Sequence, residues 1–191
     1  LIASLRNHMD LDQYMRYLGN QSVLRSGDYI DELYLIGSEQ ANGQGGIGET
    51  YRFMAWDPEG YTTCHSGGAN AYSDPNGMAY CAEGRLDFKI LPDAKVYAMF
   101  VDKLEASMNG TLSRERVAAA LTQTKTALQG LLSTPAICAA MTELRSFNTN
   151  FADCNVARSI IATRADAILA GYDARKTALL PLIATYRSKT M

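Results

Sequence analysis

The sequence predicts an all-α protein, a helical bundle of about five to six helices with a long disulfide-clipped loop in its first half. Nineteen alanines follow Pro92 and seven precede it, and apolar side chains after Pro92 recur with a helical period. Twelve of the fifteen glycines and eight of the eleven tyrosines precede residue 85. We therefore expect a single domain over residues 1–191, divided into a helix and loop part at 1–92 and a helical part at 93–191.

The first half shows three short helical patterns between polar and glycine-rich stretches. Asp10 and Gln13 form a capping-box pattern before apolar residues at helical spacing, and Gly19 is predicted to end this first helix. A second helix is predicted from Ile30 to Ala41. A third, shorter helix is predicted around Tyr51, Phe53 and Trp56, and residues 86–90 are expected to form an extended connector.

The second half has clearer helical stripes. Apolar residues at helical spacing predict helices over 97–108 and 117–131, and a further helix restarting at Pro135. Asp153 is placed to cap a long final helix. Pro181 is predicted to kink or split that helix, because proline removes a backbone donor and clashes with the preceding turn.

Charge and apolar patterning exclude several classes of function. Eighteen basic and twenty acidic residues give a net charge of −2, which offers no basic excess for a nucleic-acid backbone. No apolar run is long enough to span a bilayer, so no transmembrane segment is expected. With two histidines and no Cys-x-x-Cys pair, we expect neither a metal site nor a cofactor.

The four cysteines are Cys64, Cys81, Cys138 and Cys154, an even number that favours disulfides over free thiols. They predict a periplasmic or secreted protein. Pairing each cysteine with its neighbour along the chain gives Cys64–Cys81 and Cys138–Cys154, each contributing about 3 kcal/mol to stability. The chain begins at Leu1, which is compatible with removal of a signal peptide or with a cloning boundary.

Three patterns suggest chemistry. The glycines of 43–48 fit the dinucleotide fingerprint, but without a preceding strand we interpret them as an interhelical loop. Adjacent Cys64 and His65 are poorly placed for proton transfer. Glu39 is the alternative catalytic residue: Leu33–Glu39 and the later Tyr51–Met54 resemble the lytic transglycosylases, whose helix-end glutamate acts as general acid and base on a glycan. The competing interpretation of Glu39 is a solvated residue at a helix end.

The segment between Arg52 and Arg85 contains no lysine or arginine, but it is rich in acidic and aromatic residues. Such a crosslinked loop suits insertion into a protein partner, because aromatic side chains supply contact area and carboxylates steer a basic target. The competing interpretation is a surface loop whose tyrosines cover the protein's own core. The candidate partner-binding residues are Trp56, Asp57, Glu59, Tyr61, Tyr72 and Asp74.

One family comparison uses the run Tyr34–Asn42, the run Tyr80–Leu86 and the predicted helices 93–108 and 113–128. This pattern resembles the small helical periplasmic immunity proteins of type VI secretion, which include inhibitors of peptidoglycan-amidase effectors. The resemblance implies an all-α binding protein without catalytic residues. If the second cysteine of that family corresponds to Cys138, it also implies a Cys81–Cys138 bridge, in conflict with the local pairing.

We therefore expect a non-enzymatic protein-binding protein, an inhibitor or immunity factor against a cell-wall-targeting effector. The sequence is also compatible with a homodimer. The first alternative is a lytic-transglycosylase-like glycan enzyme that uses Glu39. The second is a structural or assembly component of an envelope or secretion machine, with the long final helix as its interaction surface.

Overall fold

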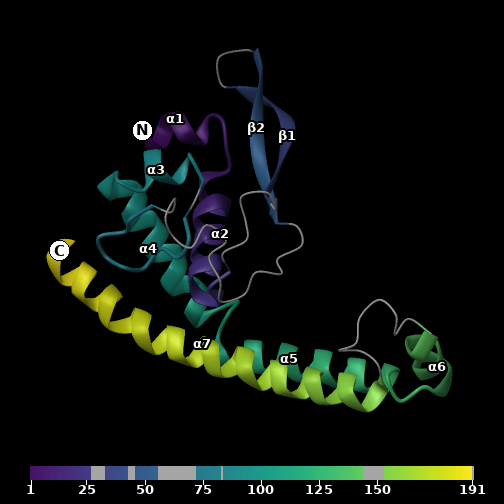
Figure 1. Cartoon of the computed structure of the whole chain (residues 1–191). Coiled ribbons are helices and arrows are strands. Elements are labelled where there is room, and N and C mark those ends of the chain that lie inside the picture. Colours follow the sequence, from purple (N-terminus) through teal and green to yellow (C-terminus); the bar gives the residue numbers. More distant parts are fainter. Residues whose placement is uncertain (27–32, 43–45, 56–71, 83, 144–152, 191) are drawn as a thin grey trace. The chain divides into compact units, whose positions relative to one another are not determined.

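The computed structural model describes residues 1–26, 33–42, 46–55, 72–82, 84–143 and 153–190. This part of the chain forms seven helices and one two-stranded antiparallel sheet (Figure 1). The all-α class is therefore confirmed. By its internal contacts the chain divides into two compact units, Leu1–Leu112 with Arg175–Met191 and Ser113–Ala174. The single domain over residues 1–191 stays a prediction.

Helix α2 (Leu11–Leu24) begins where the sequence predicts it. The Asp10 carboxylate accepts a 2.9 Å hydrogen bond from the backbone N–H of Gln13, which satisfies one free donor of the first turn. The predicted end at Gly19 is wrong, because the helix continues for five more residues. Gly19 serves packing instead: a Cβ atom there would lie 3.0 Å from the backbone nitrogen of Leu104.

Helix α4 (Ala94–Asn109) supplies the other half of the first unit's core. Asp93 caps it by accepting hydrogen bonds from the backbone N–H groups of Lys95 and Val96. Its predicted apolar stripe is buried against α2, which matches the helical period of the sequence. Core side chains with no solvent exposure include Met15, Val96, Phe100, Leu104 and Met108.

The predicted helices around residues 30–41 and 51–56 are wrong, because the described residues form a β-hairpin. Strand β1 (Leu33–Asn42) pairs antiparallel with β2 (Gly46–Ala55), with Leu33 opposite Ala55 and Asn42 opposite Gly46. The glycine-rich stretch 43–48 overlaps the connection and the start of β2, so the interhelical loop predicted there is also wrong. Along β2, Phe53 is buried while the residues on both sides of it are exposed.

Two short helices complete the N-terminal part of the first unit, α1 (Ile2–Arg6) and α3 (Asp87–Ile90). The extended connector predicted for residues 86–90 is wrong. The side chain of Asp87 accepts a 3.0 Å hydrogen bond from the backbone N–H of Gly84. This contact closes the turn before α3, and Ile90 then enters the core with 2% exposure.

The second unit contains α5 (Arg114–Leu131), α6 (Pro135–Glu143) and the first part of α7 (Cys154–Thr190). Asp153 caps α7 through the backbone N–H groups of its first turn, as predicted. Pro181 does not split α7, which continues through it to Thr190. In α5 no residue is buried, so this helix contributes much less to a hydrophobic core than α2 and α4 do.

Candidate functional site

The end of strand β2 is fixed to helix α2. The backbone N–H of Phe53 donates to Oε1 of Gln13 at 2.9 Å, and the Phe53 ring stacks on Tyr14 with centroids 4.4 Å apart. Tyr51 makes a backbone bridge to Met9, with 2.9 Å hydrogen bonds to the residues on either side of Met9. The hairpin is therefore held against the start of α2 through Tyr51 and Phe53 of β2.

The chain re-enters the described part at Tyr72, and a second anchor holds it there. The carboxylate of Asp74 accepts backbone hydrogen bonds from Asn76, Met78 and Ala79 at 2.6 to 2.9 Å. The hydroxyl of Tyr97, on α4, donates to the same carboxylate, at 2.8 and 2.7 Å to its two oxygens. Asp74 thus ties the turn 74–79 to the core helix.

The tyrosines beside Asp74 show the effect of this charge. Burial raises the pKa of Tyr97 far above its usual range, and the hydrogen bond to Asp74 raises it further. Burial also raises the pKa of Tyr72, with a further contribution from the negative charge of Asp74. The ring of Tyr72 packs edge-on against Phe88, with centroids 6.3 Å apart. Both phenols are therefore held in their neutral form.

A buried pair that the sequence analysis missed joins α2 to α3. The Tyr14 hydroxyl donates a 2.5 Å hydrogen bond to Oδ1 of Asp87, whose side chain has no solvent exposure. The sequence shows Tyr14 only as one member of an apolar stripe. The spacing of α2 gives no sign that its hydroxyl meets a carboxylate 73 residues further along the chain.

Of the predicted partner-binding residues, Tyr72 and Asp74 lie in the second anchor. Trp56, Asp57, Glu59 and Tyr61 lie outside the described residues. Their role in contacting a partner stays a prediction. The two anchors lie in the described residues that flank the segment carrying them, residues 56–71.

The placement of Glu39 as a catalytic residue at the end of a helix is wrong. Glu39 lies within β1, where its Cα is paired with that of Glu49 in the hairpin register. The resemblance to lytic transglycosylases needs the glutamate at a helix end, and the hairpin removes that setting.

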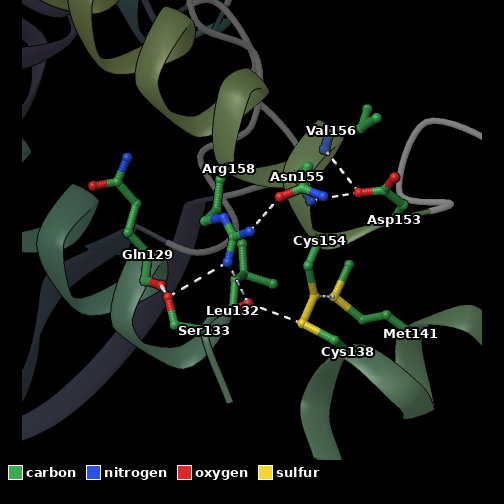
Figure 2. Close-up of a disulfide and its surroundings, with 10 residues drawn as sticks. All are labelled: Gln129, Leu132, Ser133, Cys138, Met141, Asp153, Cys154, Asn155, Val156 and Arg158. Carbon is green, nitrogen blue, oxygen red and sulfur yellow. Dashed lines mark hydrogen bonds between the residues drawn. A yellow bond between two sulfur atoms is a disulfide. The ribbon is translucent and has the colours of Figure 1, made fainter. Parts of the chain in front are cut away.

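Cys138 and Cys154 form a disulfide between α6 and α7, with their Cα atoms 5.6 Å apart (Figure 2). This is the local pairing predicted for the second cysteine pair. The rival Cys81–Cys138 bridge is wrong, and Cys81 is disulfide-bonded elsewhere. Cys64 lies outside the described residues. A small apolar cluster surrounds the Cys138–Cys154 disulfide and is formed by Leu132, Met141, Ala157 and Ile161.

Most carboxylates of the described part are already engaged. Some cap helices, some form ion pairs with lysine or arginine, and two serve the buried contacts at Asp74 and Asp87. Among the described residues, no group of three or more His, Cys, Asp or Glu side chains is arranged to hold a metal ion. The engaged acidic residues are Asp10, Asp12, Asp74, Asp87, Asp93, Asp102, Glu105, Asp153, Asp166 and Asp173.

Comparison with known protein families identifies a match over most of the chain. The family described as CotH kinase protein matches residues 2–152, which is most of the chain. The chain therefore belongs to the CotH kinase protein family. No curated protein and no solved structure shows significant similarity to it.

The match overturns the expected function. The resemblance to type VI immunity proteins is wrong, and with it the role of an inhibitor or immunity factor. That resemblance depended on apolar spacing and on the run Tyr34–Asn42, which forms a strand instead of the helix the comparison required. The glycan enzyme and the envelope assembly component are likewise unsupported by the family.

Two broader expectations, on cellular location and on membrane-spanning helices, agree with the structure. The Cys138–Cys154 disulfide is compatible with an extracytoplasmic or secreted location. Within the described part of the chain, no helix combines the length and the apolar character that crossing a membrane requires. The homodimer with which the sequence is compatible stays a prediction.

Proposed function

We propose that this chain works in phosphoryl transfer, with a nucleoside triphosphate as donor and a protein hydroxyl as acceptor, in the periplasm or outside the cell. One observation carries the proposal, the match of the CotH kinase protein family to residues 2–152. Kinases accelerate transfer by positioning the phosphates and by balancing their charge. The proposal therefore requires a segment that is held in place and that supplies free carboxylates.

The segment 56–71 meets both requirements in our proposal. The described residues that flank it are attached to the same unit, Phe53 through Gln13 of α2 and Asp74 through Tyr97 of α4. Kinase-type sites use carboxylates to hold divalent cations and to accept the proton of the acceptor hydroxyl. Because most described carboxylates have other partners, we assign this need to Asp57 and Glu59.

The aromatic residues of the same segment have a proposed role in contacting the acceptor. Trp56 and Tyr61 flank the two carboxylates in sequence. Aromatic side chains provide large contact areas at low entropic cost, which suits recognition of an acceptor protein. Tyr72 and Asp74 are better suited to holding the segment than to direct contact, since Asp74 already accepts hydrogen bonds from three backbone groups and from Tyr97.

The experiment is calorimetric titration of the chain with ATP in the presence and absence of Mg²⁺. We expect saturable binding that requires Mg²⁺ and that weakens at least about tenfold in Asp57→Asn or Glu59→Gln. The matched control is Asp102→Asn, since Asp102 is an exposed carboxylate paired with Arg187 on the outside of α4. Absence of ATP binding by the folded protein, or equal affinity in all four proteins, would contradict the proposal.

A further inference from the structure

Two arginines share one tyrosine ring in the first unit. The guanidinium carbon of Arg25 lies 5.1 Å from the centroid of Tyr80, and that of Arg175 lies 5.9 Å from it. Both positions are within the range of a cation–π contact. Three segments that are remote in sequence therefore bring two positive charges to one aromatic side chain.

Arg175 is fixed in this position by the fold. Its Nε–H donates to the carbonyl of Ser22 in the last turn of α2, and its Nη2 donates to the carbonyl of Met78, both at 2.8 Å. A cation at a helix C-terminus is favoured by the helix dipole. Burial, together with the positive charge of Arg25, lowers the pKa of Arg175. The charge of Arg25 therefore repels that of Arg175, although Arg25 takes no part in the hydrogen bonds that hold Arg175 in place.

Arg25 stands at an unusual backbone position. It is the residue that ends α2, with a φ of 53° in the left-handed region where glycine or asparagine is usual. Holding another residue there costs of order 1 kcal/mol or more, a cost that recurs at functional positions. The next residue, Ser26, has a buried hydroxyl without a hydrogen-bond partner among the described residues.

The charge of this pair is not balanced locally. In the part of the chain that the structure describes, no carboxylate forms an ion pair with Arg25 or Arg175, whereas Arg6, Arg114 and Arg187 all have one. Asp74 is the acidic residue whose charge favours Arg175, and it is occupied by the turn 74–79 and Tyr97.

We propose that Arg25, Arg175 and Tyr80 form a binding site for a phosphate group. A phosphate carries up to two negative charges and several oxygens, so it can offset two neighbouring guanidinium groups where a carboxylate would offset one. Ser26, whose buried hydroxyl has no hydrogen-bond partner among the described residues, follows Arg25 directly in sequence. The site includes no residue of the segment 56–71, and phosphate binding here does not require that the chain transfer phosphate.

The test uses the whole chain titrated with pyrophosphate at constant ionic strength. Arg25→Gln is the main variant, because Arg25 is exposed and its substitution should leave the protein folded. Arg16→Gln is the matched control, since Arg16 is an exposed arginine on the same helix and its substitution removes the same charge. We expect saturable binding that weakens about tenfold in Arg25→Gln and less than about twofold in Arg16→Gln.

Further titrations identify the source of the phosphate. Tighter binding of ATP than of O-phosphoserine would assign the site to a nucleotide, and the reverse order would assign it to a phosphorylated residue; either result supports the site. Equal weakening in both arginine variants would show non-specific attraction and would overturn it. Lack of saturable binding by the wild type, or binding of sulfate and pyrophosphate with equal affinity, would overturn it as well.

Discussion

At the scale of single residues, Asp74 does more for the fold than its place in a polar loop suggests. Its carboxylate collects hydrogen bonds from three backbone N–H groups and from the hydroxyl of Tyr97. Hydrogen bonds to a charged acceptor are stronger than those to a neutral one. The Ser-Asp-Pro-Asn-Gly sequence at 73–77 predicts a turn, but nothing in it predicts the link to α4.

We predict that Asp74→Asn lowers the free energy of unfolding by about 2–3 kcal/mol, because the amide loses the charge and turns a donor toward other donors. Asp102→Asn is the control, an exposed carboxylate whose loss should cost less than about 1 kcal/mol. Denaturant unfolding of both variants measures the difference. Equal losses would show that the Asp74 contacts contribute no more than a surface ion pair.

Gly19 offers a second test at this scale. Alanine usually stabilises a helix relative to glycine by about 1 kcal/mol. At position 19, however, the added Cβ would meet the backbone of Leu104 at 3.0 Å, so we predict a net loss of about 1–3 kcal/mol.

Gly171→Ala is the matched control, because nothing lies within 4 Å of a Cβ added at this position of α7. It should be neutral or stabilising by up to about 1 kcal/mol. The two variants are compared by thermal and denaturant unfolding. A stabilising Gly19→Ala would mean that α2 and α4 do not approach each other this closely.

At the scale of elements, the longer helices were predictable, whereas the short helices α1 and α3 and the hairpin were not. Helices α2, α4 and α5 repeat apolar residues with a period of 3.6 and carry capping residues, Asp10, Asp93 and Ser113, at their starts. The hairpin strands contain apolar residues that also fit a helical spacing over one or two turns. The strand is favoured because the Phe53 ring stacks on Tyr14, and local sequence spacing cannot reveal this tertiary contact.

The disulfide between α6 and α7 should matter for the second unit in particular, since α5 buries none of its residues. The bond joins residues 16 apart in sequence, for which chain entropy gives about 3 kcal/mol. We predict that the double variant Cys138→Ser/Cys154→Ser loses hydrogen-exchange protection in α6 while α2 and α4 keep theirs.

The double variant leaves the other disulfide intact, so it separates this bond from general reduction of the protein. Hydrogen exchange followed by mass spectrometry reads each helix separately. Unchanged protection of α6 would show that the cluster around Leu132 and Ala157 is sufficient to hold it.

At the scale of the whole molecule, alanine content and helical periodicity predicted the helical class, and the even number of cysteines predicted the Cys138–Cys154 disulfide. The lack of a long apolar run agrees with the finding that no described helix could span a membrane. These features did not predict the family. The immunity-protein comparison used apolar spacing that any amphipathic helix satisfies, whereas the family match extends over residues 2–152. The phosphate site was also beyond sequence reasoning, because Arg25, Tyr80 and Arg175 come together only through the tertiary fold.

We predict that the protein transfers phosphate and that the segment 56–71 is needed for this transfer. The most direct measurement is transfer of labelled γ-phosphate from ATP with Mg²⁺ to a protein acceptor or to the chain itself. We predict transfer by the wild type and by Asp102→Asn, and a loss of at least about a hundredfold in Asp57→Asn. Equal transfer by Asp57→Asn and the wild type, or none by any folded protein that binds Mg²⁺ and ATP, would contradict it.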